Sequence, residues 1–146
     1  MNRFAILLAA LLVTSTASAE FGTYRSHEVA DQGLIVMTEI GELRITAVDD
    51  AAFEVHYIEA GVRQLPSFAL APQRSDVVTA VAETDATLSI MVDSLTAVVE
   101  KVPLRVSFLR DGEPLVEEER GYVNDGTNVG FRFSLEPDEK ILGGGQ

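Results

Sequence analysis

The sequence predicts an all-β fold, an antiparallel β-sandwich, and two observations carry this prediction. Roughly eight to ten short segments alternate apolar with polar residues, and turn-forming residues separate them at intervals of about 8–12 residues. Beyond residue 19, no long stretch repeats apolar residues at the i, i+3, i+4 spacing of an amphipathic helix. Strands therefore have to build the core, and a sandwich buries their apolar faces against one another.

Residues 1–19 have the pattern of a secretory signal peptide. Asn2-Arg3 supplies a positive start, residues 4–13 form an apolar run too short to span a bilayer, and Ala17-Ser18-Ala19 is a small-x-small cleavage signal. We expect cleavage before Glu20 and a periplasmic or secreted product. A membrane anchor or a buried helix is the alternative interpretation of the apolar run.

The chain is strongly acidic: its 146 residues carry a formal net charge of −12 and include no cysteine. Such a surface repels nucleic acid and anionic lipid, so neither is an expected partner. No second apolar run is long enough for a transmembrane helix, so no membrane contact is expected after cleavage. Without disulfides, the domain must depend on packing. We expect one domain, with a lead-in at 20–32 and the sandwich at 33–146.

In the first half of the domain, the alternating apolar pattern and the turn residues predict a meander of antiparallel strands joined by short turns. The lead-in, which contains His27, has no clear period, and we expect it to be mobile apart from one short strand. The three strands of the meander are expected at 34–38, 43–47 and 53–58.

The second half begins with a loop at 60–72, which holds Gly61 and two prolines. Its strongest local signal is Asp111-Gly112, a dipeptide that favours the type I′ turn of a β-hairpin. Pro137 ends the last strand, because proline has no N–H to give to the ladder. The strands of this half are expected at 76–83, 87–92, 95–102, 104–108, 114–119 and 128–135.

The alternate apolar positions of these strands predict a core. Its expected members include Leu43, Ile45, Val55, Leu104, Val106, Phe108, Phe131 and Phe133. The stretch 76–106 also supplies apolar residues to both strand faces, which predicts a face covered by another protein. A well-filled sandwich with scattered surface apolar residues is the alternative. The residues concerned are Val77, Val78, Val81, Leu88, Ile90, Met91, Val92, Val98 and Val99.

Three acidic clusters are the candidates for carboxylate catalysis, which needs two acids held about 5–10 Å apart across a cleft. Asp49-Asp50 lies in a turn, where aspartate bonds the backbone, and Asp138-Glu139 lies in a loop. Glu117-Glu118-Glu119 lies on an expected exposed strand, where three neighbours cannot all face one cleft. We interpret all three clusters as solvated surface.

Other chemistry has little support in the sequence. His27 and His56 are too few to hold zinc in a chain without cysteine. No G-x-S-x-G elbow is present, and Gly143-Gly144-Gly145 is not followed by the residues of a nucleotide loop. Three tyrosines and no tryptophan offer few platforms for sugar stacking. The sequence thus predicts no catalytic residues, no cofactor site and no metal ligands in this chain.

The C-terminal residues 139–146, EKILGGGQ, resemble the segment that ends the N-terminal β-sandwich of glycoside hydrolase family 31, commonly E-x-(I/F)-Y/L-G-(L/G)-G-E. Gln146 stands where the family usually has glutamate. Residues 101–106 followed by Asp111-Gly112 resemble a hairpin of the same domain. Residues 41–45 followed by 53–57 resemble its opening strand pair. The resemblance covers roughly residues 33–146.

The resemblance implies a galactose mutarotase-like sandwich in an exported glycoside hydrolase that acts on α-glucosides. The resemblance implies the activities of this family, which are those of α-glucosidases, α-xylosidases and α-glucosyltransferases. The two catalytic aspartates of the family lie in a (β/α)₈ barrel that follows the sandwich. That barrel is expected outside these residues, with this domain as its non-catalytic support and as a contributor to binding of α-linked oligosaccharide. The alternative is a free-standing exported β-sandwich that binds carbohydrate or protein without catalysis.

Overall fold

The computed structural model describes residues 21–65, 77–124 and 126–140. The predicted signal peptide, much of the predicted 60–72 loop and the triglycine segment lie outside these residues. Within them the chain forms ten strands: β1 (Tyr24–Ala30), β2 (Gly33–Thr38), β3 (Gly41–Asp49), β4 (Ala52–Glu59), β5 (Ala80–Glu83), β6 (Thr87–Val92), β7 (Leu95–Lys101), β8 (Leu104–Arg110), β9 (Glu113–Asn124) and β10 (Val129–Phe133).

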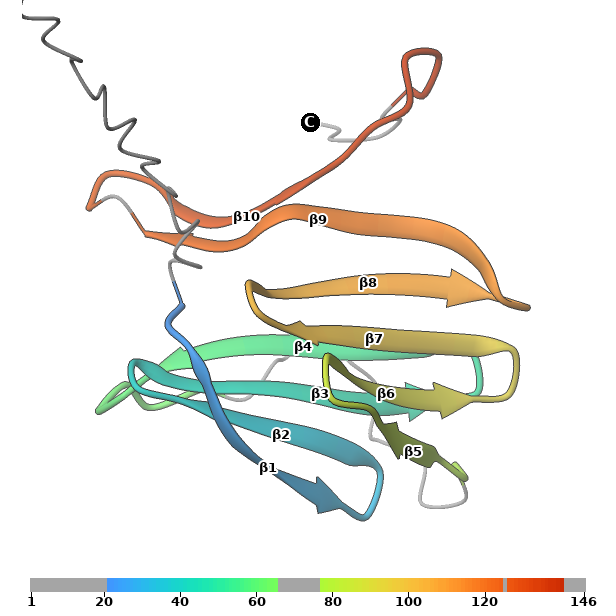
Figure 1. Cartoon of the computed structure of the whole chain (residues 1–146), viewed down its shortest axis with the longest axis horizontal. Helices are drawn as coiled ribbons and strands as arrows, with labels where there is room; N and C mark the ends of the chain where they lie inside the picture. The colour runs from blue at the N-terminus through green and yellow to red at the C-terminus, as the bar shows by residue number, and fades with distance from the viewer. Residues whose placement is uncertain (1–20, 66–76, 125, 141–146) are drawn as a thin grey trace, which may run out of the picture.

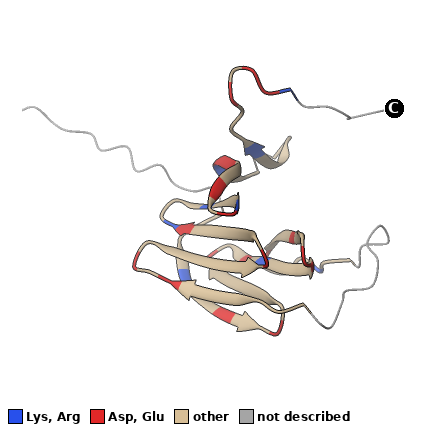
Figure 2. Ribbon diagram, turned by 90° about the vertical axis from the view of Figure 1, so that its right-hand side faces the viewer, with Lys and Arg blue, Asp and Glu red and all other residues tan. Residues whose placement is uncertain are grey.

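The strands make two antiparallel sheets, each of them a meander in which neighbours in sequence are neighbours in space (Figure 1). One sheet has the order β1-β2-β3-β4, and the other has the order β10-β9-β8-β7-β6-β5. The prediction of an all-β fold with two antiparallel sheets is confirmed. Many acidic and basic residues lie at strand ends and in turns (Figure 2), and β9 carries a run of four charged residues, Glu117 to Arg120, in its interior.

The turn at Asp111-Gly112 has the predicted geometry. Both residues have positive φ, 53° and 85°, and the type I′ turn requires positive φ at its two central positions. The hairpin that it closes pairs Arg110 with Glu113. A two-residue turn of this type sets the register of the first pairs, Arg110↔Glu113 and Leu109↔Pro114, and the register then shifts between Leu109 and Phe108.

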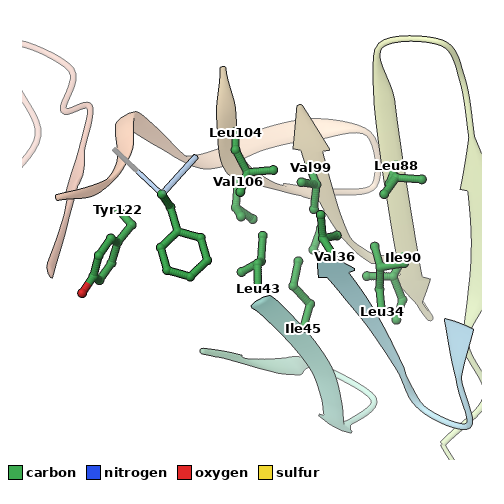
Figure 3. Packing of buried hydrophobic residues seen from close by; sticks show 12 residues of the cluster. Leu34, Val36, Leu43, Ile45, Leu88, Ile90, Val99, Leu104, Val106 and Tyr122 are labelled. Carbon is green, nitrogen blue, oxygen red and sulfur yellow. The ribbon is translucent and has the colours of Figure 1, made fainter. Parts of the chain in front are cut away.

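The core lies between the sheets, and side chains from the two layers point toward one another (Figure 3). Leu43, Ile45, Leu104 and Val106 are buried as predicted. Val55 and Phe108 are partly buried and pack against the same cluster. The remaining members of the cluster are Phe21, Leu34, Val36, Leu88, Ile90, Ala97, Val99 and Tyr122.

The prediction of Phe131 and Phe133 as core residues was wrong: 54% and 38% of their surfaces are exposed. Their side of the sheet was nevertheless predicted correctly. Phe131 is paired with Tyr122 and Phe133 with Glu118, both buried, and directly paired residues share a face. β10 is the outermost strand of a six-stranded sheet that faces a sheet of four. The two phenylalanines therefore face inward where the opposite sheet provides little cover.

The predicted surplus of apolar residues on both faces of the stretch 76–106 was also mostly wrong. β6 and β7 alternate regularly, with Leu88, Ile90, Val92 and Val99 facing the core. Of the residues predicted to form the surplus, only Val78 and Met91 are among the exposed large apolar side chains. The strand expected at 76–83 begins only at Ala80.

The lead-in is more ordered than predicted, since most of it forms β1 and pairs with β2 from Ala30↔Gly33 onward. Phe21, which the sequence pattern did not identify, is completely buried. Its ring makes edge contacts with Tyr57 and Tyr122, at 5.0 Å between centroids in each case. The aromatic ring thus fixes the start of the described chain to both sheets.

Candidate docking surface on β9 and β10

The most prominent surface feature is an apolar stripe on β10 and the residues that follow it. Val129, Phe131, Phe133 and Leu135 alternate with Gly130, Arg132 and Ser134, so they lie on one side of an extended chain. Their exposed fractions are 66, 54, 38 and 50%. The Ser134 amide still donates to the Glu117 carbonyl at 2.8 Å, and beyond it the chain leaves the two sheets (Figure 1). We call these four residues the β10 stripe.

A shallow open pocket of about 530 Å³ lies along the stripe, with apolar atoms forming most of its wall. Its lining consists of Val116 of β9 and of Phe131, Arg132, Phe133, Ser134, Leu135 and Glu139. The two phenylalanine rings contact each other, with centroids 5.1 Å apart. An apolar hollow beside paired aromatic rings is suited to receiving a side chain of another protein surface.

The opposite side of the same strands is charged. Arg132 lies 3.5 Å from Glu119 on β9, and Arg105 of β8 forms a two-point ion pair with Glu100 of β7 at 2.9 Å. Arg105 also lies 3.8 Å from Glu117. This ladder of opposite charges keeps the outer face of the sheet in water. The hairpin of β9 and β10 is therefore amphipathic, with its apolar side directed inward.

Two tyrosine–carboxylate pairs hold this hairpin to the four-stranded sheet, in opposite directions. Tyr57 of β4 donates its hydroxyl hydrogen to Glu118 of β9 at 2.7 Å. Tyr122 of β9 donates to Glu59 of β4 at 2.9 Å, and Asn124 donates to the same carboxylate oxygen at 2.7 Å. The two tyrosine rings stack with centroids 5.3 Å apart. Polar and aromatic contacts thus join the sheets where aliphatic packing ends.

The two carboxylates of these pairs have opposite pKa shifts. Burial raises the pKa of Glu118, although the hydrogen bonds from Tyr57 and the Val106 amide oppose this change. Hydrogen bonds from Asn124 and Tyr122 lower the pKa of Glu59. Burial, together with the neighbouring Glu118 carboxylate, raises the pKa of the Tyr57 hydroxyl, so tyrosine is the donor in this pair.

Paired carboxylates with divergent pKa values can indicate acid–base catalysis, but the geometry favours a structural role here. Glu118 is 2% exposed, and one of its carboxylate oxygens accepts bonds from Tyr57 and from the Val106 backbone. Glu59 borders an open pocket of about 310 Å³ whose lining does not include Glu118. A substrate in that pocket would meet one acid of the pair and not the other.

The interpretation of Glu117-Glu118-Glu119 as solvated surface was wrong for its middle member. Alternation along β9 directs Glu117 and Glu119 to the charged outer face and Glu118 into the sandwich. No signal in the triplet identifies its buried member. That assignment depends on the strand register and on Tyr57, 61 residues away in sequence.

Of the other predicted candidates, Glu139 lines the pocket beside the stripe, and Asp49 and His56 are not part of its lining. Asp49 accepts a hydrogen bond from the Ala51 amide at 2.7 Å, as expected for an aspartate in a turn. His56 lies 3.3 Å from Glu54 on β4. Glu139 accepts a bond from the Glu136 amide at 3.1 Å in the loop after β10. The structure does not gather these side chains into one site.

A second polar cluster joins the sheets at β1 and β5. The ammonium group of the buried Lys101 donates to Glu83 at 2.8 Å and to the Thr84 carbonyl at 2.7 Å, and it lies 5.0 Å from the centre of the Tyr24 ring. His27 lies 2.9 Å from the Tyr24 hydroxyl and 3.9 Å from Glu83. The hydrogen bond from Lys101 lowers the pKa of Glu83. These contacts satisfy a buried cation, which is a structural role.

Among residues 21–65, 77–124 and 126–140, no group of three or more His, Asp or Glu side chains is placed to hold a metal ion. In the same ranges, no helix is long and apolar enough to cross a membrane.

The fold places the chain in the class of two-sheet antiparallel β-sandwiches, with one sheet wider than the other. The chain matches the family model of the glycosyl hydrolase 31 N-terminal galactose mutarotase-like domain over residues 42–146, and it belongs to that family. The resemblance noted in the C-terminal segment and the two upstream hairpins is thereby confirmed. A comparison with curated proteins found no match.

Proposed function

We propose that this chain is the non-catalytic N-terminal domain of an exported glycoside hydrolase that acts on α-glucosides, and that the β10 stripe docks on the catalytic barrel. The single observation that carries the docking proposal is the uncovered inner face of β10. Four large apolar side chains line up there without an opposing sheet. Burying them against protein removes apolar surface from water, which favours association.

The chemistry of the stripe favours a protein surface over a sugar. Val129 and Leu135 are aliphatic and offer no flat ring, and phenylalanine has no polar group to orient a hydroxyl. Contact with α-linked oligosaccharide is the second candidate function. One observation supports it, namely that Arg132, Ser134 and Glu139 also line the pocket beside the paired phenylalanine rings.

The proposal places both catalytic carboxylates in the barrel, outside this chain. The purified chain should therefore not turn over aryl α-glucosides or malto-oligosaccharides, because hydrolysis needs a nucleophile and an acid positioned together. The three acids that line the described pocket of about 310 Å³ are already bonded, Glu39 to the Thr23 amide, Glu42 to Arg44 and Glu59 to Tyr122. Turnover that persists through purification and disappears on changing one acid of this chain would contradict the proposal. Reading the gene beyond the codon for Gln146 tests the same point, since the proposal requires a frame that encodes a barrel.

The docking surface is tested with the chain alone. ANS fluorescence and sedimentation velocity are measured for the wild type and for a Phe131→Ser, Phe133→Ser double variant. We expect the wild type to bind ANS and to self-associate, and the double variant to lose both properties. Met91→Ser is the matched control, because Met91 is an exposed apolar residue on β6, away from the stripe. A monodisperse wild type that does not bind ANS would contradict the docking proposal.

A titration with malto-oligosaccharide separates the two candidate functions. Docking on protein predicts that the sugar leaves ANS binding unchanged. A saturable displacement of ANS by the sugar, lost in the double variant, would favour the carbohydrate site instead.

A further inference from the structure

The backbone ladder between β8 and β9 stops before β8 does. The paired residues run from Arg110↔Glu113 to Ser107↔Glu117. On its other side, β8 remains paired with β7 through Val99↔Val106 to Lys101↔Leu104. The backbone pairing of β9 with β8 is therefore interrupted after Glu117, beside residues 104–106 of β8.

The side chain of Glu118 accepts the hydrogen bond from β8 that a backbone carbonyl of β9 would accept in a regular ladder. The Val106 amide donates to the Glu118 carboxylate at 2.7 Å, and the Tyr57 hydroxyl donates to the same oxygen at 2.7 Å. A buried amide without a partner is costly, so an interruption of the backbone pairing requires a substitute acceptor. Glu118 provides it and connects it to the opposite sheet.

Gly121 brings the backbone of β9 back against β8 three residues after Glu118. Its φ is +76°, and a β-carbon there would lie 2.4 Å from the Leu104 carbonyl oxygen, so the two backbones approach too closely for any side chain. The pairs Phe131↔Tyr122 and Phe133↔Glu118 leave residues 119–121 of β9 opposite Arg132 alone. This bulge bends β9, and β10 is carried along with it.

The bent end of the hairpin is then held by β4. Tyr122 is buried, stacks on Tyr57 and donates to Glu59. Glu118 and Tyr122 are thus two fixed points, one on each side of the bulge, and each is bonded to a residue of β4. The hairpin cannot rotate about the bulge while both hydrogen-bond sets persist.

We infer that Glu118 is a positioning residue that sets the direction in which the β10 stripe faces, by giving the Val106 amide and the Tyr57 hydroxyl an acceptor where the backbone pairing of β8 with β9 is interrupted. The inference rests on the docking role proposed for the stripe. It gives a reason for a carboxylate at a position where strand alternation would otherwise favour an apolar side chain. The orientation of the β10 stripe then depends on Glu118, Tyr57 and Val106, which are not part of the stripe.

Hydrogen exchange measured residue by residue tests the inference in the chain as it stands. In Glu118→Leu, which fills the space but accepts no hydrogen bond, we expect amide exchange in 129–133 and at Val106 to rise at least tenfold more than exchange in β2 and β6. Glu117→Gln is the matched control, since Glu117 belongs to the outer charge ladder. It should leave the exchange of β10 at the wild-type level.

Tyr57→Phe removes one donor to the carboxylate and keeps the ring, so it carries the test if Glu118→Leu does not fold. We expect a selective rise in β10 exchange of about threefold or more. A rise of the same factor throughout both sheets, or no rise in β10, would overturn the inference. The outcome is independent of ANS binding by the Phe131→Ser, Phe133→Ser variant. If exchange rises selectively in β10 but the stripe does not bind ANS, Glu118 still positions the hairpin, and only the docking role of the stripe is contradicted.

Discussion

The six-stranded sheet presents the same kind of inward face in two places, and only one of them is covered. On β6, β7 and β8 the inward residues Leu88, Val99 and Leu104 are completely buried against the four-stranded sheet. On β10 the inward residues Phe131 and Phe133 remain exposed. The alternation of side chains along a strand therefore decides the face on which a residue lies. The width of the opposite sheet decides whether that face is buried or exposed to solvent.

The largest expected difference between the two regions is the cost of truncating a side chain. Leu104→Ala should lower the free energy of unfolding by about 2–5 kcal/mol, since it leaves a cavity in a packed core. Phe133→Ala should cost less than about 1 kcal/mol in the isolated chain, because its ring is only partly covered. Denaturant unfolding of both variants provides the comparison. Equal losses would mean that β10 is as well packed as β8.

Glycine substitution compares the bulge of β9 with an open turn. Gly121→Ala should destabilise by roughly 2–4 kcal/mol, since positive φ and a clash with the Leu104 carbonyl combine there. Gly112 also has positive φ, but a β-carbon would meet nothing within 4 Å. Gly112→Ala should therefore cost only about 1 kcal/mol. Thermal unfolding of the two variants measures the difference, and a reversed order would contradict the close approach of β9 to β8.

The polar contacts between the sheets are expected to contribute less. Tyr57→Phe removes the hydroxyl but keeps the stacked ring, so it should cost about 1–2 kcal/mol, mainly from the loss of one donor to a buried carboxylate. Tyr57→Leu, which also removes the ring contacts with Phe21 and Tyr122, should cost more. If both variants cost the same in denaturant unfolding, the hydroxyl alone is responsible and the aromatic stack contributes nothing.

The smallest expected effect is a pH dependence that isolates Glu118. Because burial raises its pKa, the folded state binds this proton more readily than the unfolded state, whose value is near 4.5. The contribution of Glu118 is therefore most favourable at low pH and declines as pH rises through the raised pKa. The wild type should gain stability relative to Glu118→Gln between pH 7 and pH 4.

Glu39, Glu59 and Glu83 have lowered pKa values and act in the opposite direction, which is why the difference between the two proteins is the quantity to measure. These groups are present in both proteins and cancel in the comparison. A stability difference that is constant with pH, or that moves in favour of the variant on acidification, would contradict the raised pKa.

Much of the fold could be predicted from the sequence because its signals are local. Alternation located the strands, and Asp111-Gly112 fixed a hairpin whose two residues have the required positive φ. The inward side of Phe131 and Phe133 was also predicted correctly. Their exposure was not, because it depends on the number of strands in the opposite sheet, which no single strand encodes.

The features of the candidate site were harder to predict for the same reason. The burial of Glu118 depends on a tyrosine 61 residues away and on an amide that loses its ladder partner. Phe21 lies in a segment without alternation, and its burial follows from packing against both sheets. Both cases depend on which distant strands lie together and on the width of each sheet. These properties are set only by the tertiary structure.

The most direct test of docking is hydroxyl-radical footprinting of the β10 stripe, in this chain alone and in a protein that joins it to the catalytic barrel that the proposal requires. We expect Phe131, Phe133 and Leu135 to react readily in the chain alone and to be protected several-fold in the longer protein. Met91, an exposed apolar residue of β6, should react equally in both. Equal reactivity of the stripe in the two proteins would show that the uncovered face of β10 is not a docking surface for the catalytic domain.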